Sequence, residues 1–358
     1  MRIAQIAPLD EAVPPHFYGG TERIVAYLCD SLVEMGHDVT LFASAESRTR
    51  AKLVKMRDQA IRLDKTELKS HLAAHLAMMH EVKSRQHEFD VLHFHTDVVH
   101  FPFFEDSADR TLTTLHGRLD LKDLPNALMR WPDYPLASIS DSQRTPLPHA
   151  NWAATVLHGL PMKQFRFSPA PQGGYLAFLG RVSPEKGPIR AIEIARAAGI
   201  PLKIAAKVDA HDEAYFHRHV EPLLNHELID FIGEIGDEDK SDFLGNALAL
   251  LFPIDWPEPF GLVMIEAMAC GTPVIAWNCG AVPEIVDDGV TGFVVNSHEQ
   301  ALAAIGRLKL LNRLRIRHIC ERRFSAVAMA KRYLDVYVRL VGRSAYEHER
   351  MSAGISAV

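Results

Sequence analysis

The sequence has 358 residues, and at roughly 150 residues per domain this length suggests two domains. Hydrophobic residues make up 47% and charged residues 23%, close to the average for globular proteins, which excludes a disordered or fibrous chain. Lysine and arginine total 39 against 45 for aspartate and glutamate, so the net charge of −6 supplies no overall field for binding nucleic acid.

Cysteine usage and hydropathy bear on the compartment. The cysteines have neither Cys-x-x-Cys nor zinc-knuckle spacing, and few scattered cysteines suit a reducing compartment. The first residues form a short apolar run that ends at Pro8, too short for a signal peptide, and no stretch of 18 apolar residues occurs. We therefore expect a cytoplasmic protein with no transmembrane segment. The four cysteines are Cys29, Cys270, Cys279 and Cys320.

The N-terminal half alternates short β-branched runs with longer amphipathic segments. Residues 3–7 predict a strand, and a glycine turn then leads into a helix whose apolar residues recur every three or four positions. Gly36 stands where a helix C-cap belongs, before the next run. This β-α-β rhythm predicts a parallel sheet covered by helices on both faces. The further strands are expected at 38–43, 91–94, 111–115, 137–139 and 155–157.

The rhythm restarts after residues 168–174, a segment rich in proline and glycine that we interpret as an interdomain linker. Strands are then predicted at 175–179, 202–205, 229–232, 249–252 and 273–276. The fold class is therefore α/β, with two Rossmann-like, doubly wound parallel-sheet domains facing across a cleft. We expect an N-terminal domain at 1–168 and a second domain at 169–325, with a last helix near 326–358 packing back on the N-terminal domain. Ligands of such sheets bind outside the carboxyl ends of the strands.

The densest cluster of functional residue types follows the strand at 249–252. A proline-rich loop carries Glu258, and a helix that begins near Gly261 carries Glu266 eight positions further on. The first N–H groups of that helix, those of Gly261, Leu262 and Val263, form an anion site with the positive end of the helix dipole. Ionised carboxylates accept hydrogen bonds from sugar or ribose hydroxyls. Phosphate at the helix end, flanked by two such carboxylates, indicates a sugar nucleotide.

Two further turns follow predicted strands. Arg181 and Lys186 lie in the turn after 175–179, where an arginine fork and a lysine point charge can hold a diphosphate. The segment Phe17-Tyr18-Gly19-Gly20 lies after the first strand, and its glycines allow a close approach of backbone to ligand. It lacks the G-x-G-x-x-G spacing of a dinucleotide site.

Together these segments resemble a family 4 glycosyltransferase with the GT-B fold, and the two carboxylates match that family's E-x7-E motif. The resemblance implies that Arg181 and Lys186 hold the donor diphosphate, that Glu258 contacts the transferred sugar, and that Glu266 binds the ribose. It also places His116 at the reacting centre, and it implies retention of anomeric configuration with neither metal nor other cofactor. It further implies that the domain at 1–168 binds the acceptor and the domain at 169–325 binds the nucleotide-sugar donor. The donor-binding residues expected on this basis are Gly19, Gly20, Arg181, Lys186, Glu258, Pro259, Phe260, Gly261, Leu262, Val263 and Glu266.

The expected function is transfer of a hexose from a nucleoside-diphosphate sugar to an acceptor hydroxyl, with UDP-glucose as the first donor considered and GDP-mannose as the second. The acceptor has no signal in the sequence. A GT-B epimerase acting on a sugar nucleotide would share the donor site, and a glycoside phosphorylase or hydrolase also uses paired carboxylates. These alternatives stay open at this point.

Two other patterns have a functional and a structural interpretation. His93, His95 and Asp97 alternate along a strand and could bind zinc, but we interpret them as polar residues at a strand end. The run 307–323 holds seven lysines or arginines and one acidic residue, Glu321. It could contact anionic lipid at a membrane surface, although we favour a solvated helix face whose leucines pack in a core.

Overall fold

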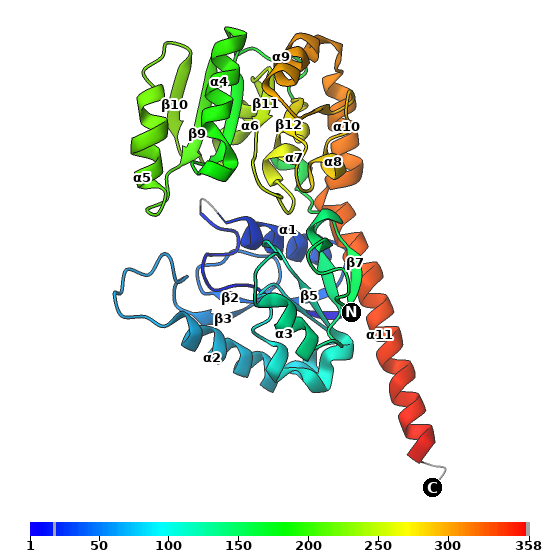
Figure 1. Ribbon diagram of the computed structural model, residues 1–358. Helices are drawn as coiled ribbons and strands as arrows, with labels where there is room; N and C mark the ends of the chain where they lie inside the picture. The colour runs from blue at the N-terminus through cyan, green and yellow to red at the C-terminus, as the bar shows by residue number, and fades with distance from the viewer. Residues whose placement is uncertain (17–18, 356–358) are drawn as a thin grey trace. The chain divides into compact units, whose positions relative to one another are not determined.

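The computed structural model describes residues 1–16 and 19–355, with side chains up to residue 342 of the last helix. Phe17 and Tyr18 of the predicted glycine segment lie outside the described residues. The chain divides into two compact units, Met1–Gly159 with Ala326–Val358, and Leu160–Ser325. Each contains its own sheet, coloured mainly blue to cyan in unit 1 and green to yellow in unit 2 (Figure 1).

Unit 1 is built on a parallel sheet of seven strands in the order β3-β2-β1-β4-β5-β6-β7. The central strands are buried on both faces, so their apolar residues alternate with polar side chains, such as Gln5, His93 and Thr114, that are buried as well. The strands are β1 Arg2–Ile6, β2 Asp38–Ser44, β3 Lys52–Arg57, β4 Val91–Phe94, β5 Thr111–Thr114, β6 Leu136–Ser138 and β7 Trp152–Thr155.

The helices of unit 1 come from both parts of the chain. Helix α1 buries the face that carries Ile24, Leu28 and Leu32, and α11 packs against α1 and β4. Tyr333 and Tyr337 of α11 are fully buried, so this last helix supplies part of the core of unit 1. The helices are α1 Gly20–Glu34, α2 His71–Ser84, α3 Leu124–Arg130 and α11 Ala326–Ile355, with short 3₁₀ helices at Gln86–Glu88, Phe101–Phe103, Glu105–Arg110 and Ser142–Arg144.

Unit 2 repeats the plan with a parallel sheet of six strands in the order β10-β9-β8-β11-β12-β13. The strands are β8 Leu176–Arg181, β9 Leu202–Lys207, β10 Ile229–Gly233, β11 Ala249–Phe252, β12 Val274–Trp277 and β13 Gly292–Val295. The helices are α4 Pro188–Ala198, α5 Glu213–Tyr215, α6 Asp237–Gly245, α7 Leu262–Ala269, α8 Val282–Ile285, α9 His298–Arg307 and α10 Arg313–Phe324. A π-helical turn at Phe216–Val220 and 3₁₀ turns at Met162–Gln164, Pro184–Lys186, Glu221–Leu223 and Leu308–Leu310 complete it.

The predicted α/β class with two parallel sheets is confirmed, and the strands that the sequence analysis missed or shifted lie at sheet edges. Strand β3 carries lysine and arginine on a partly exposed edge, and β13 is only four residues long. Strand β7 ends at Thr155, where the sequence analysis expected it to begin. It is a half-buried edge strand with two alanines, which carry little strand propensity.

The segment 168–174 is not a free linker. Its Ser168 N–H donates to the carbonyl of Cys270 at 3.0 Å, and the Gly173 N–H donates to the carbonyl of Asn246 at 3.0 Å. Unit 2 begins earlier, at Leu160, rather than at the expected residue 169. Proline and glycine therefore mark a turn-rich surface segment here, because the backbone groups it leaves free bond to unit 2 itself.

The basic run 307–323 is also different from the expected solvated face. Arg313 donates to the carbonyls of Ser168 and Gly245 at 2.8 and 2.7 Å, and burial lowers its pKa to about 10. Leu310 and Leu314 are 70% and 49% exposed instead of lying in a core. The reason is that Asn312 caps α10 and interrupts the run, so the leucines do not share one helix face.

Among the described residues, every helix is too short or too polar to cross a bilayer.

Candidate functional site

In unit 2, two loops at the carboxyl ends of β8 and β11 are held against each other. Gly187 ends the 3₁₀ turn after β8 with a φ of +70°, and a Cβ there would clash with the carbonyl oxygen of Pro253. The Asp255 N–H donates to the carbonyl of Glu185 at 2.8 Å, which ties the second loop to the first. Because a side chain would separate the loops, glycine at 187 is what allows Lys186 to reach the loop that carries Glu258.

Lys186 and Glu258 form a largely buried ion pair. The Nζ of Lys186 lies 2.5 Å from Oε2 of Glu258, and their side chains are 18% and 11% exposed. The indole N–H of Trp256 donates to the same oxygen at 2.9 Å, and Lys186 Nζ lies 4.9 Å from the centre of the Trp256 ring. The indole of Trp256 therefore helps to fix the Glu258 carboxylate.

A third loop, after β12, supports Glu258 from the other side. Gly280 has a φ of +59°, and a Cβ there would overlap the backbone of Glu258. The next N–H, that of Ala281, donates to the Glu258 carbonyl at 2.9 Å. Sequence reasoning missed Gly280, although a glycine three residues after a strand end is the available signal.

Helix α7 begins beside this loop, as predicted. Gly261 is its N-cap with a φ of +85°, and a Cβ would lie 2.8 Å from Met264 Cε and 3.0 Å from Phe252 Cζ. The N–H groups of the first turn, which includes Leu262 and Val263, have no acceptor inside the helix, and the dipole favours an anion there. Pro259 precedes Phe260, whose buried ring packs on Phe324 at a centroid distance of 6.3 Å.

Glu266 lies inside α7 and is almost completely buried. Its side chain is 3% exposed and its Oε1 accepts a hydrogen bond from Lys240 Nζ at 3.0 Å. Lys240 also pairs with Asp237 at 3.1 Å on its own helix, α6. Sequence reasoning did not find Lys240, since a single lysine among the acidic residues of a helix does not form a recognisable binding or catalytic motif. The two glutamates of the E-x7-E motif are thus each paired with a lysine in unit 2.

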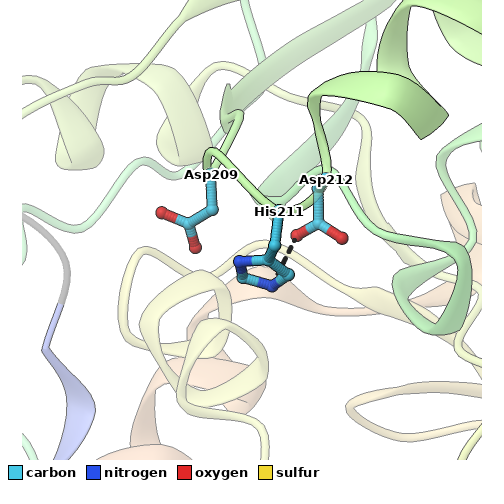
Figure 2. Close-up of side chains that lie close together, drawn as sticks. All are labelled: Asp209, His211 and Asp212. Carbon is cyan, nitrogen blue, oxygen red and sulfur yellow. Dashed lines mark ion pairs between the residues drawn. The ribbon is translucent and has the colours of Figure 1, made fainter.

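Arg181 stands at the end of β8 among three carboxylates. Its Nη2 lies 2.5 Å from Glu185, its Nε 3.3 Å from Asp212 and its Nη1 3.8 Å from Asp209. Figure 2 shows Asp209, His211 and Asp212 projecting from the loop after β9, with the imidazole of His211 against Asp212. Their ligand atoms lie within 4.8 Å of one another, the one grouping of metal-ligating type in the described part of the chain. Arg181 and Lys207, which lies 2.9 Å from Asp209, already supply cations here, so we interpret it as an ion-pair cluster.

In unit 1, His116 follows β5 and is partly exposed. Its Nε2 lies 2.8 Å from Nδ1 of His95, and its ring stacks on that of His158 at 5.3 Å. Burial lowers the pKa of His116 to about 3, so the ring is neutral at pH 7. The amide of Gln143 donates to the carbonyls of Leu115 and Gly117 at 2.9 and 2.8 Å, which fixes the backbone on both sides of His116.

The other predicted histidines are buried rather than set at the edge of a strand. Both ring nitrogens of His93 are hydrogen-bonded at 2.7 Å, to Tyr337 and to Thr114. His95 uses its second nitrogen at 2.8 Å from Gln5. Burial lowers the pKa of both rings well below the ordinary value. Since these nitrogens are committed to protein partners, they do not form the zinc site that the sequence alternation allowed.

The glycine segment after β1 leads directly into α1. Gly19 is the N-cap and Gly20 the first helical residue, and a Cβ on Gly19 would lie 2.8 Å from Pro15 Cβ. Glu22 in the first turn is buried, and burial, with smaller contributions from Asp10 and Glu11, raises its pKa to about 7.

The sequence matches two family models that together span both units. Residues 163–322 match the family described as glycosyl transferases group 1, and residues 18–152 match glycosyltransferase family 4. The phosphatidyl-myo-inositol mannosyltransferase of Mycolicibacterium smegmatis is 26% identical over 351 residues, which cover 86% of this chain and 85% of that protein. The D-inositol 3-phosphate glycosyltransferase of Streptomyces scabiei is 42% identical over 78 residues, and this match spans 22% of the chain and only 17% of that relative's length.

Solved structures share the fold over nearly the whole chain. A glycosyltransferase involved in avilamycin A biosynthesis is similar with a TM-score of 0.70 at 24% identity, covering 96% of this chain and 98% of that one. HepE of Anabaena in complex with UDP-glucose is similar with a TM-score of 0.71 at 18% identity, covering 95% and 100%. The chain therefore belongs to glycosyltransferase family 4 and has the GT-B fold.

Proposed function

We propose that this glycosyltransferase moves a hexose from a nucleoside-diphosphate sugar to an acceptor hydroxyl with retention of anomeric configuration and without a metal ion. The observation that carries the proposal is the paired arrangement of Lys186 with Glu258 and of Lys240 with Glu266 around the start of α7. Each carboxylate is fixed in position by its lysine, and a fixed carboxylate is a good acceptor for sugar hydroxyls.

Each group has a separate role in donor binding. Lys186 and the first N–H groups of α7 hold the diphosphate, while Glu258 accepts hydrogen bonds from the hexose hydroxyls and Glu266 from the ribose. Arg181 is the second diphosphate cation, and it exchanges one of its three carboxylate partners for a phosphate oxygen. Gly19 and Gly20 belong to the loop that approaches the donor.

The chemistry follows from where charge develops. As the bond between the anomeric carbon and the phosphate oxygen breaks, the diphosphate gains negative charge, which Lys186 and the α7 dipole stabilise. With a pKa of about 3, His116 is too weak a base to take the acceptor's proton at neutral pH. The acceptor hydroxyl therefore attacks from the face that the diphosphate leaves, and its proton passes to the departing phosphate oxygen. His116 acts at the reacting centre as a neutral hydrogen-bonding group.

The names of the relatives suggest which substrates to test. A mannosyltransferase among them supports GDP-mannose as donor, and the UDP-glucose complex of HepE supports UDP-glucose, which stays our first candidate. Relatives named for inositol phosphates make a phosphorylated polyol the acceptor to try first. An epimerase would convert the donor sugar without any acceptor, and a hydrolase would release free hexose, so incubation with donor alone separates these alternatives from transfer.

The decisive experiment compares Glu258→Gln with Glu266→Gln by calorimetric titration with the intact nucleotide sugar and with the bare nucleoside diphosphate. Loss of a charged hydrogen-bond acceptor weakens binding by about 2 kcal/mol, or roughly 30-fold. We expect Glu258→Gln to weaken the intact donor alone, and Glu266→Gln to weaken both ligands because both contain ribose.

Glu193→Gln is the matched control, since Glu193 is an exposed carboxylate of unit 2 whose partner is the exposed His298. It should leave both affinities unchanged. Equal weakening of both ligands by Glu258→Gln, or unchanged binding in Glu266→Gln, would show that the two roles are wrong.

A further inference from the structure

Seven polar side chains of unit 1 form one hydrogen-bonded chain that ends at His116. From Gln5 one branch runs through His95 to His116, with distances of 2.8 Å at both steps. The other branch runs from Gln5 Nε2 to the hydroxyl of Tyr337 at 3.0 Å and from there to His93 at 2.7 Å. It continues from His93 to Thr114 at 2.7 Å and from Thr114 to Tyr333 at 3.0 Å.

Such a chain has two self-consistent proton orders. Burial keeps the three histidines neutral, so each ring has one N–H and one bare nitrogen. If the Gln5 amide nitrogen faces Tyr337, the Gln5 oxygen accepts from Nε2 of His95, whose Nδ1 then accepts from Nε2 of His116. If the amide is turned over, every donor and acceptor along the chain is reversed, and His116 carries its proton on Nδ1.

Two observations select the first order. The amide nitrogen of Gln5 faces the Tyr337 hydroxyl, and its oxygen faces His95. In addition, Nδ1 of His116 is buried and has no hydrogen-bond partner among the described residues. A buried N–H without an acceptor is more costly than an acceptor without a donor. The reversed order would place an unsatisfied N–H at this position. It is therefore disfavoured both at Gln5 and at His116.

We propose that Gln5 and His95 are positioning residues that hold His116 in the tautomer with its proton on Nε2, leaving Nδ1 as a bare acceptor. Helix α11 takes part through Tyr337, whose hydroxyl accepts the Gln5 amide hydrogen and fixes the amide orientation. Gln143 fixes the backbone on either side of His116 and so the position of the ring, while Gln5 and His95 fix which ring nitrogen carries the proton.

The consequence for the site rests on the proposed function. With its single N–H donated to His95, His116 has no proton to donate from Nδ1. Since Nδ1 is buried, it can only accept a hydrogen bond there from a small donor such as an ordered water. The reversed tautomer would present an N–H instead and would repel a hydroxyl hydrogen at that point. Gln5 and His95 thus decide whether Nδ1 of His116 accepts or donates a hydrogen bond.

The tautomers can be read directly by two-bond ¹H–¹⁵N correlation on protein labelled with ¹⁵N-histidine at pH 7.5. In the wild type we expect His95 and His116 each to carry one proton, on Nε2. A proton on Nδ1 of His116, or a mixture of tautomers, would overturn the proposal. This measurement needs no substrate and no variant that must fold.

Gln5→Met tests the cause, because it keeps the volume of the side chain and removes both of its hydrogen bonds. We expect His116 to become a mixture of tautomers and kcat to fall roughly ten-fold, with KM for the nucleotide sugar changed less than three-fold. An unchanged single tautomer in this variant would overturn the assignment of Gln5. A mixture of tautomers with unchanged kcat would support the positioning and would remove His116 from the proposed reaction.

His100→Gln is the matched control. His100 is as buried as His93 and bonds Thr113 at 2.9 Å, outside the chain that leads to His116. This variant should leave the tautomer of His116 unchanged. A mixed His116 tautomer in this control would overturn the proposal, since loss of any buried histidine would then be enough.

Discussion

Lowering the pH from 7.5 to 5.0 should unfold unit 1 while unit 2 stays folded. Burial lowers the pKa of five histidines of unit 1 far below the ordinary value of about 6.5, and for His116 the folded value is about 3. These groups take up protons only when the unit unfolds, so stability is fully present above pH 6.5 and falls as the pH drops toward the folded pKa values. The other four are His93, His95, His100 and His158.

The magnitude follows from linkage. At pH 5.0 each histidine that stays neutral in the folded state lowers the free energy of unfolding by about 2 kcal/mol relative to pH 7.5. The five histidines together lower it by about 10 kcal/mol. Glu22 acts in the opposite sense, because its folded pKa of about 7 is raised and the stability it contributes is lost as pH rises. Because Glu22 is protonated in the folded state at pH 5.0, it raises the free energy of unfolding by about 2 kcal/mol relative to pH 7.5. The net loss of about 8 kcal/mol is comparable to the whole stability of a typical domain.

Hydrogen exchange read by mass spectrometry at both pH values distinguishes the units, with peptides from β4 and β5 reporting on unit 1 and peptides from β8 and β11 on unit 2. His100→Phe should recover about 2 kcal/mol of the pH-dependent loss. His298→Gln, which changes an exposed histidine of unit 2, should recover nothing. Equal protection of β4 at the two pH values, or proton uptake on unfolding of less than about one proton, would refute the reasoning.

Three further outcomes are expected. Gly261→Ala should destabilise unit 2 by about 3 kcal/mol in denaturant titration, against about 1 for Gly289→Ala, which has a φ of +71° but open space around it. Lys240→Met should lower the free energy of unfolding by about 3 kcal/mol because it removes the lysine that pairs with the buried Glu266. The control Lys203→Met, which changes a 40% exposed side chain, should change the free energy of unfolding by less than about 1 kcal/mol. Transferase activity should survive EDTA, and a loss that only added Mg²⁺ or Mn²⁺ restores would contradict the metal-independent reaction.

Local sequence signals were sufficient for most of the fold. The central strands are short apolar runs between turn residues, and the predicted ranges at 91–94 and 249–252 coincide with β4 and β11. Strand β3 was missed because an edge strand needs no continuous apolar run, and its lysines fit its exposed positions. The boundary of unit 2 was misplaced because proline and glycine signal a turn equally well inside a domain and between domains.

The candidate site was predictable only where its residues are close in sequence. The spacing of Glu258 and Glu266 is a local motif, and so is the turn that carries Lys186. Their partners are different: Lys240 lies 26 positions before Glu266, and Tyr337 lies 244 positions after His93. No periodicity connects such pairs, because they meet only when strands and helices far apart in the chain are packed together. The alternation of His93 and His95, in and just after β4, was therefore compatible with zinc, and only their hydrogen-bond partners decide against it.

The discontinuous make-up of unit 1 has a consequence for synthesis. Gln5 is translated before unit 2 and its partner Tyr337 after unit 2, so the hydrogen bond between them forms only when both parts of unit 1 have been made. Domains tend to fold as units during synthesis, in the order in which they are completed. Unit 2 is complete at Ser325, before α11 has been made, so the second half of this protein is able to finish folding first. Until α11 docks, the nascent unit 1 lacks Tyr333 and Tyr337, so Thr114 and His93 have not yet gained these hydrogen-bond partners.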